Sequence, residues 1–191
     1  MKSCLLSFNI YLLAAAALGG GCGSHYLSPN KEYATLSIFL QGRPADSLPV
    51  QIGPDKATVY VAPTPVLTED DLAKARLVDN PDGSYAIQLT FDDNGKLVLE
   101  MQTTSNPGKS LIIFAKFPPK GWTEPKDADA PAIEKPHPGQ PRISAWLAAF
   151  PIPRNGLANG SLVFIPDASH AEAEHIVRGL NNMVSAMNKQ K

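Results

Sequence analysis

The chain has little of what most enzymes, disulfide scaffolds and nucleic-acid binders need. It has two cysteines, Cys4 and Cys22, and four histidines among 191 residues. Lysine plus arginine (17) nearly balance aspartate plus glutamate (18), so no excess of basic residues points to nucleic acid. Beyond the first 20 residues no apolar run approaches the roughly 20 residues that a membrane-spanning helix requires. These absences exclude a disulfide framework, a nucleic-acid-binding protein and a polytopic membrane protein.

The N-terminus has the pattern of an export signal that ends at a cysteine. Met1-Lys2 is positively charged, and 5–18 is almost entirely apolar but too short to span a bilayer. Three small residues, 19–21, precede Cys22, as lipoprotein signal peptidase requires. We therefore predict a lipoprotein signal peptide at 1–21 and lipidation of Cys22. The alternative is an ordinary secretory signal cleaved elsewhere, because Gly19 stands where the usual lipobox has leucine.

The cysteine count favours lipidation. Cys4 lies in the removed segment, so the mature chain would keep one thiol at its N-terminus, and an unmodified lone thiol is a liability in an oxidising compartment. Residues 22–33 are predicted to form a tether that attaches the protein to the membrane. Gly23 and Ser24 follow the cysteine, and no aspartate is there to favour inner-membrane retention. The predicted location is the periplasmic side of a bacterial envelope, with the outer membrane favoured.

Alternating apolar residues predict an extended sheet in the rest of the chain. The predicted strands are 34–41, 57–62, 85–91, 110–116, 143–150 and 161–165, with 50–52 and 77–78 also extended. Pro63 and Pro65 are expected to end the second of these strands. The segment 110–116 is the most apolar and is expected to be central.

Three helices are predicted between these strands. One begins with Thr68 as its N-cap and Asp71 completing a capping box, and is expected to end near Ala75. A second is initiated by 92–95 and runs over 96–104 with Leu97, Met101 and Thr104 on its buried face. The last is capped by Ser169 and Glu172, and its apolar stripe is formed by Ile176, Leu180, Met183, Val184 and Met187.

The predicted fold class is α+β. The order of strands and helices indicates a single two-layer sandwich over 34–188, with a mostly antiparallel sheet and helices packed on one face. The segment 118–141 contains seven prolines and no apolar period, so it is predicted to be a proline-rich surface loop.

Several segments resemble, in order, the head of the first periplasmic domain of SecD, a subunit of the bacterial protein-export machinery. The matching pieces are 66–72 with Ala75, 89–92 with Gly95, 103–113 in part, and 159–160 followed by 172–173 and Leu180. The resemblance covers about 130 residues and implies the α+β head fold. It also implies a capacity to bind polypeptide or a partner protein.

The chain departs from that family where energy coupling is concerned. The family's transmembrane helices have no counterpart in the chain, and the family's short link after its central strand is replaced by the loop at 118–141. The chain is therefore expected to be a detached head without the machinery that uses the proton gradient.

No catalytic or metal-binding pattern is present. His170 and His175 are five residues apart, a spacing that does not stack two ligands on one helix face. Asp70 and Asp71 are better explained by a helix start than by paired catalytic acids, and 92–95 lacks the remaining spacing of a calcium loop. We therefore expect no enzyme activity, no cofactor, no metal and no nucleic-acid partner.

Two tryptophans remain as candidates for contacts. Trp146 is expected to pack in the core. Trp122 begins the proline-rich loop and is the candidate binding residue, unless it folds back on its own domain. The sequence thus predicts a lipid-anchored envelope protein that binds polypeptide or a partner protein, with a possible link to protein export. The alternative is an envelope spacer protein without a dedicated ligand.

Overall fold

The computed structural model describes residues 28, 31–122 and 142–189. The predicted signal peptide, Cys22 and most of the proline-rich loop lie outside these residues. Along the chain the elements are β1 (Thr35–Gln41), β2 (Leu48–Ile52), β3 (Ala57–Thr68), the 3-10 turn η1 (Glu69–Asp71), β4 (Leu72–Asp79), β5 (Tyr85–Phe91), α1 (Asp93–Ser105), β6 (Ser110–Lys116), β7 (Ser144–Pro151), β8 (Ser161–Phe164) and α2 (His170–Met187).

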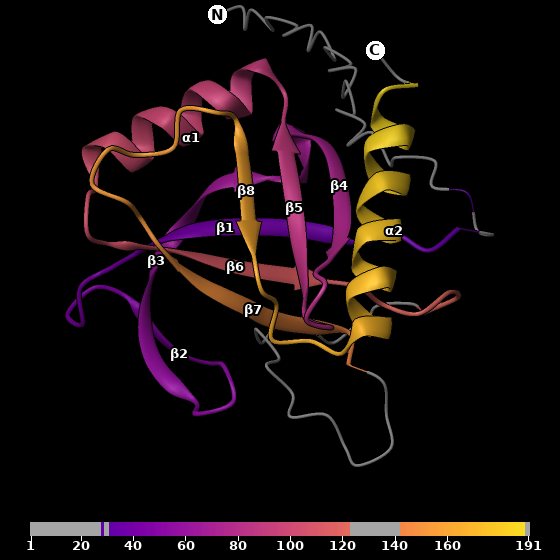
Figure 1. The fold of residues 1–191 in the computed structure, drawn as a ribbon, viewed down its shortest axis with the longest axis horizontal. Helices are drawn as coiled ribbons and strands as arrows, with labels where there is room; N and C mark the ends of the chain where they lie inside the picture. The colour runs from indigo at the N-terminus through magenta and orange to yellow at the C-terminus, as the bar shows by residue number, and fades with distance from the viewer. Residues whose placement is uncertain (1–27, 29–30, 123–141, 190–191) are drawn as a thin grey trace, which may run out of the picture.

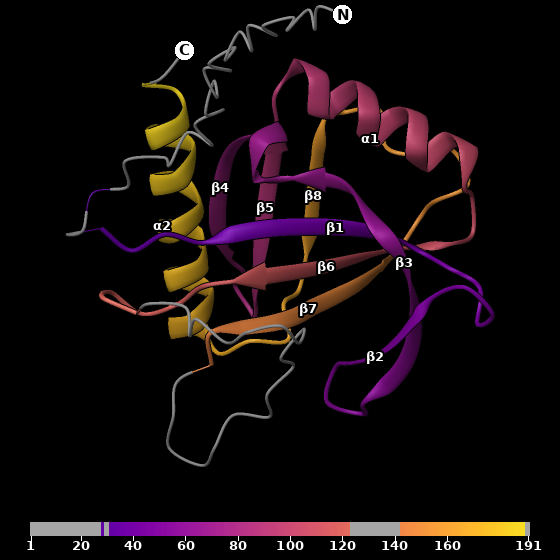
Figure 2. The ribbon, with the colours of Figure 1, turned by 180° about the vertical axis from the view of Figure 1, so that it is seen from behind.

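The strands form two antiparallel sheets. The larger sheet has the order β2-β3-β1-β6-β7 and the smaller has β4-β5-β8. Strands of the smaller sheet cross those of the larger at a steep angle, with α2 beside β4 and α1 across one end (Figure 1). Seen from behind, β1, β6 and β7 lie in front and the β2–β3 hairpin bends away from them (Figure 2). The predicted α+β class is confirmed.

The main core lies between the two sheets and α2. Alternate residues of β5, Ile87 and Leu89, are fully buried in it, as are Leu111 and Ile113 of β6. Ile112 faces the other way and joins a second cluster under the β2–β3 hairpin. Strand β6 is therefore buried on both faces and has a partner on each side, which confirms its predicted central place and explains why it is continuously apolar.

Strand β3 does not end at the prolines. It continues to Thr68, and its pairing with β1 shifts register between Phe39 and Gln41, opposite the segment that holds Pro63 and Pro65. An irregularity leaves backbone groups out of the ladder, so a residue without an N–H is tolerated there. The prediction that these prolines end the strand is wrong for that reason.

The helix predicted at Thr68 is a single 3-10 turn. Its capping box is confirmed: Thr68 accepts from the Asp70 N–H, and the Asp71 carboxylate accepts from the Thr68 N–H at 2.9 Å. From Leu72 the chain is strand β4, which has a register irregularity between Leu72 and Lys74. This irregularity lets Leu72 and Ala75, three residues apart, both be buried, a spacing that imitates a helix.

Helix α1 begins at Asp93 with Asp92 as its N-cap, earlier than predicted, and buries a different face. Leu97 is 65% exposed and Met101 54% exposed, whereas Leu99 and Thr103 are buried. Thr103 can be inside because its hydroxyl donates to the Leu99 carbonyl at 2.7 Å and accepts from the Leu157 N–H at 2.9 Å. The predicted buried face is wrong because Thr103, whose hydroxyl has two hydrogen-bond partners, lies on the side of the helix that faces the core.

Helix α2 agrees with its prediction. Ser169 is the N-cap with Glu172 completing the box, and Ile176, Leu180 and Val184 are buried against the sheets. Met183 and Met187 are half-buried. The strong apolar stripe fixed this helix in the sequence because packing onto a core and local capping favour the same register.

Arg142 and Glu172 form an ion pair that gives the fold an acid-sensitive contact. The guanidinium donates to both carboxylate oxygens, at 2.7 and 2.9 Å, and to the Asp167 carbonyl. The hydrogen bonds from Arg142 are the main reason that the pKa of Glu172 is lowered to about 2.

We expect this contact to stabilise the fold at neutral pH and to weaken in acid. A carboxyl whose pKa is lower in the folded state stabilises fully above its unfolded value and loses that contribution as pH falls towards about 2. Between pH 7 and pH 2, the free energy of unfolding measured in urea should fall by about 1.5–3 kcal/mol more for the parent protein than for the Glu172→Gln variant. Parallel curves for the two proteins would contradict the assignment.

Gly179 marks a close contact between α2 and the segment that enters β1. A Cβ at this position would lie 2.8 Å from the Ala34 backbone nitrogen and from its Cβ. Gly179→Ala, which stabilises an ordinary helix by about 0.5–1 kcal/mol, should here destabilise the protein by about 1–2 kcal/mol because the segment must move. Thermal unfolding measures the sign, with the exposed Ser185→Ala on the same helix as control. A raised melting temperature for Gly179→Ala would refute the contact.

Candidate functional site

A wide apolar groove lies between the ends of β7 and β8. Its volume is about 470 Å³, and it is broadly open to solvent. The described residues that line it are Val78, Asn80, Ala86, Ala148, Ala149, Phe150, Pro151, Val163, Phe164 and Ile165. None of these has a titratable side chain. A surface of this kind can bind apolar side chains and backbone, and it supplies no acid, base or nucleophile.

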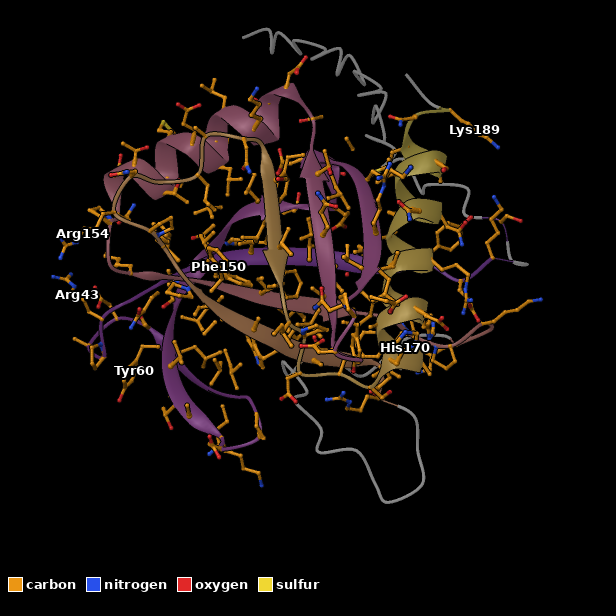
Figure 3. The ribbon with its side chains drawn as sticks, in the orientation of Figure 1. Arg43, Tyr60, Phe150, Arg154, His170 and Lys189 are labelled. Atoms are coloured by element: carbon orange, nitrogen blue, oxygen red, sulfur yellow. The ribbon has the colours of Figure 1, made fainter. Side chains whose placement is uncertain are left out.

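The groove exists because the two sheets are unequal. Five strands face three, and the smaller sheet ends at β8 while β7 of the larger sheet continues beneath its edge. Ala148 and Phe150 of β7 pack against the core and remain partly exposed. Figure 3 places Phe150 on the side of the molecule away from α2.

The edge of β8 is open to such a strand. The Phe91 N–H donates to the Gly160 carbonyl, and the register pairs Leu89 with Leu162. Because hydrogen-bonded pairs alternate along antiparallel strands, the backbone groups of Val163 point away from β5. Within the described part of the chain no strand lies beside Val163, so its N–H and C=O can pair with an added segment.

The other edges near α2 and β7 are protected. Asn181 of α2 accepts from the Ala75 N–H at 3.0 Å and donates to the Ala75 carbonyl at 2.9 Å, which closes the outer edge of β4. On β7 the Leu147 carbonyl accepts from the Asp167 N–H, and Pro151 has no N–H to offer. Among β4, β7 and β8, the contrast identifies β8 as the edge best suited to strand addition, and the remaining edge strand, β2, contains Pro49, which has no N–H to offer.

Two exposed apolar side chains, Val163 of β8 and Ile165 directly after it, lie next to this edge. Val163 is 47% exposed and Ile165 is 69% exposed, although alternate residues Leu162 and Phe164 already face the core. Edge strands usually place a charge or proline at such positions to prevent association. Here the first proline comes at Pro166, after the strand has ended. The exposed apolar side chains are consistent with a surface that is covered when the protein works.

The sequence-predicted binding residue is not in this groove. Trp122 is 37% exposed and lies in a turn in which its N–H donates to the Pro119 carbonyl at 3.1 Å. Cys22 lies outside the described residues. Trp146 is half-buried, with ring centroids 4.8 Å from Phe114 and 5.7 Å from Phe39, as expected of a packing residue.

The polar candidates that were set aside are engaged in structural contacts. Asp71 and Asp92 cap backbone N–H groups, and His170 Nε2 lies 3.1 Å from an Asp79 oxygen at the surface. The described residues contain no group of three histidine, cysteine or acidic side chains that could hold a metal.

One feature of the sequence indicates the groove. The strand 161–164 is apolar at Leu162, Val163 and Phe164, which predicts burial on both faces, yet only one face has a partner in the structure. Reading Val163 as an uncovered position required the strand order, which a single sequence does not supply.

Comparison with known proteins gives matches to solved structures alone. No family model matches the chain, and no curated protein matches it. Three solved structures of SecDF are similar to it. One, of SecDF as a membrane component that enhances protein export, has 22% identity and a TM-score of 0.48 and covers 79% of this chain and 63% of its own.

The other two matches cover a smaller share of longer chains. SecDF in a super-membrane-facing form has 20% identity and a TM-score of 0.49 over 83% of this chain and 20% of its own. SecDF from Thermus thermophilus has 22% identity and a TM-score of 0.40, and the match covers 78% of this chain and 19% of the SecDF chain. The chain thus spans less than two thirds of each structure. These three structures come from the family that the sequence resembles.

Within the described residues no helix is both long and apolar enough to cross a membrane.

Proposed function

We propose that this chain is a non-catalytic, lipid-anchored protein of the bacterial envelope whose head binds an extended segment of another polypeptide. The open edge of β8 beside the apolar groove carries this proposal. Backbone hydrogen bonds to Val163 would supply affinity without regard to sequence, and the groove would favour apolar side chains at alternate positions. The proposed link to protein export comes from the sequence resemblance to SecD.

The anchor in this proposal is Cys22, acylated after removal of 1–21. A diacylated or triacylated cysteine would keep the head at the membrane surface, because two or more acyl chains together hold a protein there stably. The prediction of Cys22 rests on the sequence pattern of 1–22.

Trp122 is proposed as a second contact. A partly exposed tryptophan is a frequent anchor in protein interfaces, since it covers a large area with few rotatable bonds. It is separate from the groove lining, so it would add to a partner's contact rather than form part of the strand-addition site.

Photo-crosslinking in intact cells tests the proposal. A photoreactive residue is placed at Val163 or Trp122, and at Leu97 as a control, because Leu97 is an apolar residue on α1 that is even more exposed than either of them. Adducts from Val163 that are identified by mass spectrometry as exported polypeptides or as one discrete protein support the binding function. Adducts from Val163 no more abundant than those from Leu97 would contradict it and leave the spacer protein as the better explanation.

A further inference from the structure

The segment that leads into β1 is fixed to the C-terminal half of α2. Asn182 donates to the Glu32 carbonyl at 2.9 Å, and Arg178 donates to the Glu32 carboxylate at 2.9 Å. The close approach of Ala34 to Gly179 completes this attachment. The chain therefore leaves the head at a defined place, beside the end of α2.

A hollow of about 280 Å³ with a mixed polar and apolar lining lies at that place. Tyr33, Asn182 and Ser185 form part of its lining, and its charged side chains are Lys31 and Lys189. Within the described part of the chain neither ammonium group has a carboxylate partner, and no acidic residue lines the hollow. The nearby Glu32 is engaged by Arg178. The hollow is thus locally positive on a protein whose net charge is −1.

The length of the chain places this hollow near the proposed anchor. Ser28, which lines the hollow, is six residues after Cys22. Six fully extended residues span at most about 20 Å. If Cys22 carries lipid, Ser28 can therefore be no more than about 20 Å from the membrane surface. From there Lys31 and Lys189 can reach anionic headgroups, which attract basic side chains near the surface.

From this geometry we propose that the hollow at the end of α2 binds anionic phospholipid headgroups of the membrane that holds the anchor. The phosphate oxygens accept hydrogen bonds from the Lys31 and Lys189 ammonium groups. This inference rests on the lipid anchoring in the proposed function and adds an orientation to it. Lys189 and Phe150 lie on opposite sides of the molecule (Figure 3), so docking through the hollow turns the apolar groove away from the membrane.

The test uses the full chain, purified in its acylated form and reconstituted into vesicles. The vesicles are phosphatidylcholine alone or phosphatidylcholine with phosphatidylglycerol, and both carry a nitroxide at the headgroup. A dye is attached at Asn188→Cys, the exposed C-cap of α2 outside the lining of the hollow, or at Thr58→Cys, an exposed position on β3. We expect phosphatidylglycerol to increase the quenching of the dye at 188 much more than that of the dye at 58.

Charge reversal separates docking from simple proximity. Lys31→Glu with Lys189→Glu should lower the ratio of docked to undocked protein roughly 25-fold or more, because each basic side chain near an anionic surface contributes about fivefold. The control is Lys56→Glu with Lys120→Glu, the same charge change at exposed positions outside the hollow. High salt should weaken docking of the parent protein, since it screens exposed charges.

Two readouts keep the inference and the proposed anchor distinguishable. Mass spectrometry shows whether Cys22 is acylated. If phosphatidylglycerol increases quenching equally at 188 and 58, or if the Lys31 and Lys189 changes have no effect, the headgroup site is overturned even if Cys22 is acylated. If Cys22 carries no lipid, the anchor fails, and co-sedimentation of the unacylated chain with the same vesicles decides the hollow. Binding to anionic vesicles that the two lysine changes abolish supports it, and no binding overturns it.

Discussion

Val163→Pro should lower the affinity for an unfolded polypeptide about tenfold or more while the domain stays folded. The Val163 N–H points away from β5, so proline removes no hydrogen bond from the β5–β8 pair. It does remove the donor that an added strand would use, and its ring occupies the edge. Fluorescence anisotropy with a labelled, reduced and alkylated polypeptide that cannot fold measures the change.

Two comparisons identify the cause of such a loss. Leu162→Pro removes an N–H that pairs with β5 and should lower the melting temperature, which Val163→Pro should change little. Val163→Lys should also weaken binding, because a charged edge residue disfavours strand addition, whereas Leu97→Lys on α1 should not. Unchanged affinity of Val163→Pro, with its fold intact, would exclude β8 as the binding edge.

Asn181→Leu should destabilise the protein by about 2–4 kcal/mol. The substitution removes both hydrogen bonds to the buried Ala75 and leaves its N–H and C=O without partners, at a cost of roughly 1–3 kcal/mol for each group. Leucine is similar in size to asparagine, so the loss reports the hydrogen bonds rather than a cavity. Urea unfolding monitored by circular dichroism gives the free energy.

The same substitution should also expose a second sheet edge. The outer edge of β4 lies under α2, and with Asn181 gone it offers an unpaired strand next to Ala75. Light scattering near the unfolding midpoint should therefore rise for Asn181→Leu and stay low for Ser185→Ala. A loss below about 0.5 kcal/mol would show that water replaces the amide and that Asn181 is not the cap of this edge.

Caps and apolar periodicity in the sequence correctly predicted the elements that neighbouring residues stabilise. Ser169 with Glu172 and the apolar stripe from Ile176 fixed α2, and clean alternation fixed β5. The same rules failed where tertiary packing overrides them. The register irregularity after Leu72 gave a strand the apolar spacing of a helix. Because the Thr103 hydroxyl is hydrogen-bonded, α1 buries a different face from the predicted one.

The candidate site could not be predicted from the sequence, for a different reason. Whether an apolar residue is covered depends on which strand lies next to it, and Val163 is uncovered because β8 follows β5 in a sheet that ends there. The hollow at the end of α2 likewise needs Lys31 and Lys189, which are far apart in the chain, to be brought together. Neither arrangement leaves a local pattern.

The sequence by itself thus determined the α+β class, the capped helix α2 and the central apolar strand, because each depends on neighbouring residues or on composition. The tertiary structure alone decided which edges are open. Asn181 closes β4, Asp167 and Pro151 protect β7, and β8 is left free beside an apolar groove. That outcome depends on contacts between segments up to about a hundred residues apart, and such contacts are what folding adds to the chain.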